Sequence, residues 1–220
     1  MKAKGLVMAG VLVLAACSRS GTIFGDIFVQ TPSGDVKRAA RIEMRAVPST
    51  RAFESEWVTT IAAFQAEVEP VLQLQKTAAS SAEAAKLEWD KALAARGAAL
   101  SRAGRRNWSR GPSPRVQELW RQMRAADDAL FQAKKRVWEV AVRHGTLGEA
   151  LLDRHKAQQV QTDADGHYVL PGLPAGKVHL YAQFVVASQT FTWFRPVQVR
   201  RGAQQVDLTQ ANSSGWPFVP

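Results

Sequence analysis

The longest uniform feature of the sequence is a helical pattern that runs through residues 49–157. Apolar side chains recur there at steps of three and four residues, which is the spacing of one face of an α-helix. In the second half the pattern is unbroken over five heptads, as in a coiled coil. The positions of this predicted seam are Val116, Leu119, Met123, Ala126, Leu130, Ala133, Val137, Val140, His144, Leu147 and Leu151. Since no strand-like alternation is present, we expect this region to consist of helices and the turns between them.

A break divides the helical pattern into two halves. The residues that interrupt it are Gly104, Asn107, Gly111 and Pro112. Ser113 before Pro114 is typical of a helix start, because proline at the first helical position loses no hydrogen bond. Two helices of about 45–50 residues, joined by a turn near 101–113, would form an antiparallel hairpin roughly 65–75 Å long. In the first predicted helix, the apolar positions that recur at three- and four-residue steps are Phe53, Trp57, Ile61, Phe64, Val68, Val71, Ala78, Ala82, Ala85, Trp89, Leu93 and Leu100.

Each predicted helix also contains residues that are typical of a helix end or kink. Pro70 lies inside the first helix and is expected to kink or break it. In the second helix, Gly145 can end one segment, and Thr146 with Glu149 matches a capping box that would start another. We therefore predict a hinge that interrupts both helices at the same level.

Strand-like segments flank the helical region on both sides, at 22–48 and 158–210. Ile23, Gly25, Ile27 and Val29 alternate with polar and aromatic residues, and a second alternation covers 40–46. About six short strands separated by turn signals are typical of an antiparallel sandwich. The predicted class is therefore α+β, with a helical hairpin at 49–157 inserted between the strands of a split sandwich and a C-terminal tail at 211–220.

The strand segments resemble a known group of domains. "GTIFGDIFV…GDVKRAARIEMRAVP" and "TDADGHYVLPGLPAGKVHLYAQF" are similar to the carboxypeptidase regulatory-like, prealbumin-type sandwich, over about 80 residues. The resemblance implies a non-catalytic stalk, spacer or ligand-binding module, and some relatives have a carbohydrate-binding-like fold. The large helical insertion departs from the uninterrupted domain of that group, so the resemblance assigns no ligand-site residues to this chain.

The N-terminus has the pattern of an export signal. Lys2 and Lys4 precede an apolar stretch of about 12 residues, which is too short to cross a bilayer core of about 20 residues. Leu14-Ala15-Ala16-Cys17 resembles the lipobox of bacterial lipoproteins. This resemblance implies removal of residues 1–16, a lipid and palmitate on Cys17, and a short tether at 17–21. An ordinary secretory signal is the alternative.

The lipobox resemblance also sets the expected compartment. Ser18 after the cysteine implies the outer membrane, so we expect a membrane-anchored protein of the cell envelope that faces the periplasm. Cys17 is the only cysteine, which excludes an intramolecular disulfide. Loss of Lys2 and Lys4 with the signal would lower the net charge from +10 to +8. Anionic lipid headgroups or acidic envelope polymers and proteins are the expected partners, and nucleic acid is not.

Positive charge is concentrated at the expected turn of the hairpin. Residues 102–115 contain five arginines and no acidic residue. The proposed partner-binding tip comprises Arg102, Arg105, Arg106, Trp108, Arg110 and Arg115. Arginine binds phosphate or carboxylate through two parallel hydrogen bonds, and tryptophan suits a membrane–water interface. A basic loop that only keeps the turn soluble is the alternative interpretation.

The sequence contains no pattern that indicates catalysis, a metal or a cofactor. The histidines lack metal-ligand spacing, and Asp163-x-Asp165-Gly166 has Pro174 where a calcium loop needs an acidic ligand. Nucleophile-elbow and phosphate-loop motifs are absent. We therefore expect a non-catalytic envelope lipoprotein that binds or spaces a partner. A periplasmic adaptor of a transport or secretion assembly remains the alternative, and the oligomeric state is open.

Overall fold

The computed structural model describes residues 20–31, 33–103 and 111–219, which divide into two compact units. The first unit runs to Pro48 and includes Ala157–Phe191 and Arg195–Ser213. The second comprises Ser49–Lys156, Thr192–Phe194 and the segment from Ser214 onward. The predicted leader and Cys17 lie outside the described residues.

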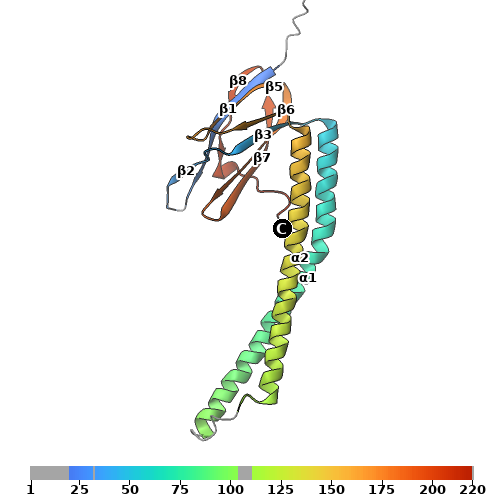
Figure 1. Cartoon of the computed structure of the whole chain (residues 1–220), viewed down its shortest axis with the longest axis vertical. Helices are drawn as coiled ribbons and strands as arrows, with labels where there is room; N and C mark the ends of the chain where they lie inside the picture. Colours follow the sequence, from blue (N-terminus) through green and yellow to red (C-terminus); the bar gives the residue numbers. More distant parts are fainter. Residues whose placement is uncertain (1–19, 32, 104–110, 220) are drawn as a thin grey trace, which may run out of the picture. The chain divides into compact units, whose positions relative to one another are not determined.

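The strands form two sheets, which are drawn in Figure 1. Their bounds are β1 Ser20–Gln30, β2 Val36–Arg38, β3 Glu43–Pro48, β4 Gln158–Gln161, β5 His167–Pro174, β6 Gly176–Val186, β7 Gln189–Val199, β8 Gly202–Gln205 and β9 Leu208–Thr209. In one sheet, β1 pairs with β2, β5, β8 and β9; the other has the order β4-β3-β6-β7. Both helices fall between the paired neighbours β3 and β4, so the predicted α+β class with an inserted hairpin is confirmed.

β1 organises its sheet through the alternation that the sequence predicts. Ile23 and Ile27 are fully buried and Val29 nearly so, whereas Phe24 on the opposite face is 37% exposed. β8 and β9 run parallel to β1, in contrast to its antiparallel neighbours. A Cβ on Gly25 would lie 2.1 Å from the backbone oxygen of Val206, so glycine is needed where this returning segment approaches β1.

β3 begins later than the alternation at 40–46 predicts. Arg41 has a positive φ of 57°, which ends extended backbone before Glu43. Thr162 holds this turn, because its buried hydroxyl donates to the carbonyl of Ala39 and accepts from the backbone N–H of Ile42. The bend therefore depends on a contact with a residue about 120 positions later in the sequence.

The second unit is built on α1 Arg51–Ala103 and α2 Pro114–His155. The predicted start of α2 is confirmed, since the backbone N–H of Val116 donates to the Ser113 hydroxyl at 3.4 Å and Pro114 occupies the first turn. The predicted seam is also confirmed from Val116 to His144, where each member is buried or half-buried. Leu147 is the exception: it is 50% exposed, and Gly148 is buried in its place.

The predicted hinge is wrong, because both helices are continuous where it was expected. Pro70 is exposed on α1, and its neighbour Val68 is buried, so packing holds the helix together although proline donates no hydrogen bond. Thr146 does not cap a new helix: its hydroxyl donates back to the carbonyl of Val142 at 2.9 Å. Gly145 leaves space on α2, and a Cβ there would lie 3.3 Å from Nε1 of Trp216.

An ion-pair cluster joins the two helices near Pro70. The imidazole Nε2 of His144 lies 2.8 Å from Oε2 of Glu67, and Arg143 pairs with the other oxygen of the same carboxylate. Hydrogen bonds from His144 and Arg143 hold the pKa of the Glu67 carboxyl below its usual value. His144 is only 5% exposed, so it is a buried seam residue rather than the site of a helix break.

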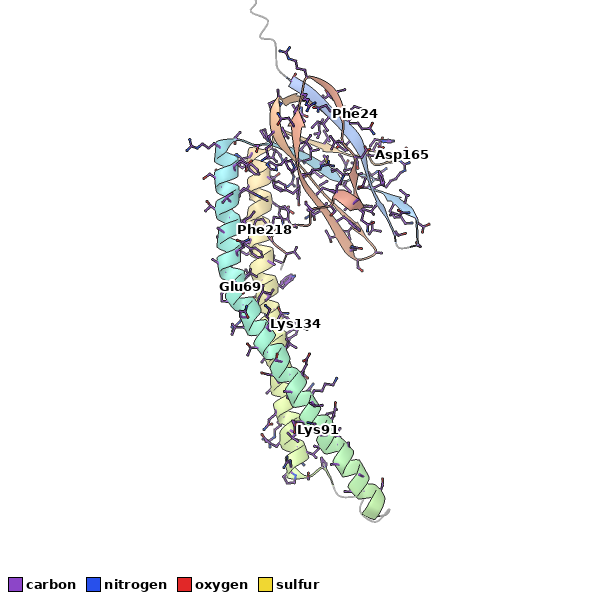
Figure 2. All side chains as sticks on the ribbon, turned by 180° about the vertical axis from the view of Figure 1, so that it is seen from behind. Phe24, Glu69, Lys91, Lys134, Asp165 and Phe218 are labelled. Carbon is purple, nitrogen blue, oxygen red and sulfur yellow. The ribbon has the colours of Figure 1, made fainter. Side chains whose placement is uncertain are left out.

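Residues 214–219 pack onto the helices, whereas the sequence predicts a C-terminal tail at 211–220. Phe218 is 1% exposed, and its ring centroid lies 5.5 Å from that of Phe64 and 5.6 Å from that of Trp57. Figure 2 shows Phe218 against the helical pair. Trp216 is 5.3 Å from Phe218, and Phe194 of β7 is 4.5 Å from Trp57, centroid to centroid. We call this group, Phe53, Trp57, Phe64, Phe194, Trp216 and Phe218, the aromatic cluster.

Candidate functional site

Only part of the predicted basic tip lies in the described part of the chain. Arg105, Arg106, Trp108 and Arg110 fall outside it. Arg102 is in the last turn of α1, and Arg115 is an exposed residue in the first turn of α2. Lys91 donates a hydrogen bond to Glu88, and this bond, with the charges of Lys91 and Arg115, lowers the pKa of the Glu88 carboxyl.

The two helices enclose a groove next to this turn. It has a volume of about 530 Å³ and opens to solvent on one side. Figure 2 shows Lys91 on this end of the hairpin. The groove is lined by residues from both helices and the loop before α2, namely Trp89, Leu93, Arg96, Pro112, Val116, Gln117, Trp120 and Arg121. We call it the turn-end groove.

Two tryptophans form aromatic parts of this lining. Trp120 on α2 is 46% exposed, an unusual position for so large an apolar side chain. Trp89 on α1 is half-buried, and its indole N–H is buried with no acceptor among the described residues. Buried donors are normally paired, so the helix pair by itself does not satisfy this part of the groove wall.

The rim of the turn-end groove is basic. Arg96 and Arg121 line it, and Arg124 lies one turn further along α2, with its guanidinium 5.4 Å from the ring centroid of Trp120. Arg121 forms an exposed ion pair with Glu118 at 2.6 Å, which contributes little stability in water. Residues 86–124 together contain ten Lys and Arg and three Asp and Glu, a net charge of +7 out of +10 for the whole chain.

The side chains that line the turn-end groove can bind anionic and cyclic groups. Guanidinium groups form paired hydrogen bonds with phosphate or carboxylate, and tryptophan rings stack on flat or cyclic groups. Within the described ranges, no group of three His, Cys, Asp or Glu side chains is placed to hold a metal ion. In the same part of the chain, no helix has both the length and the apolar character that a membrane span requires.

The loop with the sequence Asp163-Ala164-Asp165-Gly166 is a turn that its own side chain stabilises. The carboxylate of Asp163 accepts hydrogen bonds from the backbone N–H groups of Asp165 and His167, both at 2.9 Å. These bonds, the one from His167 first, keep the pKa of the Asp163 carboxyl low. The Asp163 carboxylate therefore stabilises the turn that precedes β5.

The sequence predicts a basic turn but does not predict the groove beside it. Trp89 belongs to the predicted seam of the first helix, and Trp120 falls outside the heptad pattern, which is its one signal in the sequence. Trp216 and Phe218 lie in the predicted C-terminal tail, so the sequence pattern does not identify them as core residues. Their signal was a pair of aromatic residues two positions apart, together with Gly145 and Gly148 on one face of α2.

Comparisons with known proteins give a limited result. No family model matches the chain, and no curated protein matches its sequence. Among solved structures, a proposed carbohydrate-binding protein from Pseudomonas aeruginosa aligns at 13% identity and a TM-score of 0.35, over 88% of this chain and 90% of that one. The pilus backbone protein RrgB from Streptococcus pneumoniae aligns at 14% identity and a TM-score of 0.25, over 86% of this chain and 41% of that one.

Proposed function

We propose that this chain is a lipid-anchored, non-catalytic binding protein of the bacterial cell envelope. In this proposal the turn-end groove binds phosphate or carboxylate groups of an envelope surface. The observation that carries it is a groove lined by two arginines and two tryptophans, within a stretch of sequence, residues 86–124, that holds seven of the ten net positive charges. The lipobox-like segment before Cys17 supports the anchor, and Ser18 supports the periplasmic face of the outer membrane.

The groove and its rim have complementary roles in this proposal. Arg96 and Arg121 belong to opposite helices and line one groove, so an anionic group between them can contact both. The exposed ring of Trp120 supplies an apolar surface beside them. Basic residues near an anionic membrane contribute about 1 kcal/mol each, and added salt screens this attraction.

The anchor is tested by replacing its attachment atom. We expect the wild-type chain, expressed in a bacterium and labelled with radioactive palmitate, to carry label and to sediment with membranes. Cys17→Ser should lose the label completely, because no other thiol exists in the chain. Ser18→Ala is the matched control and should keep the label. Equal labelling of Cys17→Ser and wild type would contradict lipidation at this residue.

The groove is tested by removing its two arginines. We expect Arg96→Ser with Arg121→Ser to weaken binding at least about tenfold, since each basic residue near an anionic surface contributes about 1 kcal/mol. The control, Arg51→Ser with Arg136→Ser, removes the same charge from exposed helix positions outside the groove. Every variant is made in the Cys17→Ser background, so that no attached lipid inserts into the vesicles, and binding is measured by co-sedimentation with phosphatidylglycerol vesicles in one arm and with isolated peptidoglycan in the other.

The two arms distinguish the source of the anionic group. Loss of vesicle binding alone points to lipid phosphate, and loss of peptidoglycan binding alone points to carboxylate. Equal weakening by the groove pair and the control pair would show that only net charge matters, which contradicts a specific groove. Binding that does not decrease with salt would contradict the electrostatic basis of the proposal.

A further inference from the structure

α2 carries a second apolar stripe in addition to its seam with α1. Trp120, Phe131, Trp138 and Val142 are spaced by 11, 7 and 4 residues, which places them on one face of the helix. They are 46%, 64%, 64% and 46% exposed, so neither α1 nor the C-terminal segment covers them. At about 100° per residue this face lies roughly 110° around α2 from the seam. Exposed tryptophan and phenylalanine in one stripe are typical of an interaction surface.

The charges around Phe131 are arranged symmetrically. Asp127 and Asp128 lie four and three residues before it, and Lys134 and Lys135 lie three and four residues after it. Lys135 is 3.8 Å from Glu139, a loose contact between exposed groups. Asp127, Asp128 and Lys134 form no ion pair with another described residue. Phe131 is therefore flanked by an acidic pair on its N-terminal side and by a basic pair on its C-terminal side.

We propose that this stripe binds the same stripe of a second copy of the chain, with the two α2 helices antiparallel and a two-fold axis at Phe131. Antiparallel pairing about this residue places Asp127 and Asp128 of one copy opposite Lys134 and Lys135 of the other. Because a two-fold axis repeats each contact, both charge clusters of both copies are paired. A parallel arrangement would place acids against acids and bases against bases, which flanking positions of helix pairs avoid.

The remaining contacts of the pair are complementary in shape and chemistry. Phe131 packs against the partner's Phe131 on the axis. Arg124, which already covers the ring of Trp120, lies opposite the partner's Trp138, so its guanidinium can stack between two indoles. Val142 lies opposite the partner's Trp120.

A second groove lies on the same side of α2, beyond Trp138. It has a volume of about 700 Å³ and is lined by Lys134, Trp138, Val142, Trp216 and Val219, among others. Figure 2 shows Lys134 on α2 between Lys91 and Phe218. In the antiparallel pair this groove faces the turn-end half of the partner's α2, which carries the partner's Trp120. The apolar surface beside the stripe is thus used as well.

The proposal is tested by charge reversal. One variant carries Asp127→Lys and Asp128→Lys, and the other carries Lys134→Glu and Lys135→Glu. We expect the wild-type full chain in detergent to sediment as a dimer, and each variant alone to show a dimer dissociation constant at least tenfold higher. An equimolar mixture of the two variants should recover the wild-type constant, because each reversed cluster then meets its opposite. None of the four residues lines the turn-end groove, so the charge reversals leave its lining unchanged.

A crosslinking experiment locates the axis. In a Cys17→Ser background, Phe131→Cys should form a disulfide-linked dimer under mild oxidation, because a residue on a two-fold axis meets itself. Ala129→Cys, exposed on the other side of α2, should not. Far-ultraviolet circular dichroism of every variant checks that the helices are intact. A monomeric wild type, or no recovery in the mixture of two folded variants, would overturn the proposal. The proposal would also be overturned if the wild-type chain were monomeric and its stripe selectively bound another protein.

Discussion

Phe218→Ala is expected to lower the free energy of unfolding of the helical unit by about 3–5 kcal/mol, the usual cost of removing a buried aromatic ring. Phe218 is 1% exposed, and it lies between the two helices and the rest of the C-terminal segment. Its ring contacts those of Trp57, Phe64 and Trp216 in edge-to-face geometry. Its loss would leave a cavity that the rigid helix pair cannot close.

Val219→Ala is the matched control for this prediction. The next residue in the chain is 66% exposed, so its truncation should change the free energy of unfolding by less than about 0.5 kcal/mol. Both variants are measured by chemical denaturation with circular dichroism at 222 nm, which reports the helices. If Phe218→Ala were as small in effect as Val219→Ala, residues 214–219 would be a tail, as the sequence alone suggests.

Gly148→Ala should also destabilise the helical unit, by about 1–3 kcal/mol, although alanine is normally the better helix residue by about 1 kcal/mol. A Cβ at this position would lie 2.3 Å from Cε2 of Phe218 and 3.1 Å from Cζ2 of Trp216. The buried ring of Phe218 cannot retreat without opening the aromatic cluster. The overpacking cost is therefore larger than the gain in helix propensity, and the net sign is unfavourable.

Two other helical glycines, Gly97 and Gly145, serve as comparison positions for this prediction. Gly97→Ala meets nothing within 4 Å, so it should stabilise α1 by about 0.5–1 kcal/mol through propensity alone. Gly145→Ala places its Cβ 3.3 Å from Nε1 of Trp216, and its effect should fall between the other two. In thermal denaturation, the midpoint temperature should therefore be highest for Gly97→Ala, lower for Gly145→Ala and lowest for Gly148→Ala. A Gly148→Ala midpoint at or above that of Gly97→Ala would contradict the close packing of the C-terminal segment.

Features that depend on residues close in the sequence are predicted correctly, and features that depend on distant residues are not. Ser113 and Pro114 start α2 as predicted, because a helix cap depends on atoms within one turn. The same local rules predict a helix break at Pro70, Gly145 and Thr146, and this prediction is wrong. α1 continues through Pro70, and α2 continues through Gly145 and Thr146, because contacts with residues far away in the sequence, such as Glu67 with His144, stabilise both helices. At Leu147 the seam prediction failed because Gly148 leaves space that Phe218 fills.

The turn-end groove was predictable only in part. The arginines of residues 102–115 are evident as a charge cluster in the sequence, between the two predicted helical halves. That Trp89 and Trp120 line one groove depends on how the two helices meet across the turn. A periodicity specifies which face of each helix is apolar, but it does not specify which side chains of the two faces lie opposite each other.

The amino-acid sequence by itself determined the helical hairpin, the α2 seam as far as His144 and the alternation of β1, since each depends on neighbours within a few residues. Only the tertiary structure decided that β8 and β9 join β1 in parallel, that both helices are continuous and that Trp216 and Phe218 complete the helical core. Those outcomes depend on space that small residues leave in one element and bulky residues fill from another. The pairing of Gly25 with the segment at Val206, and of Gly148 with Phe218, becomes defined only when the chain is folded.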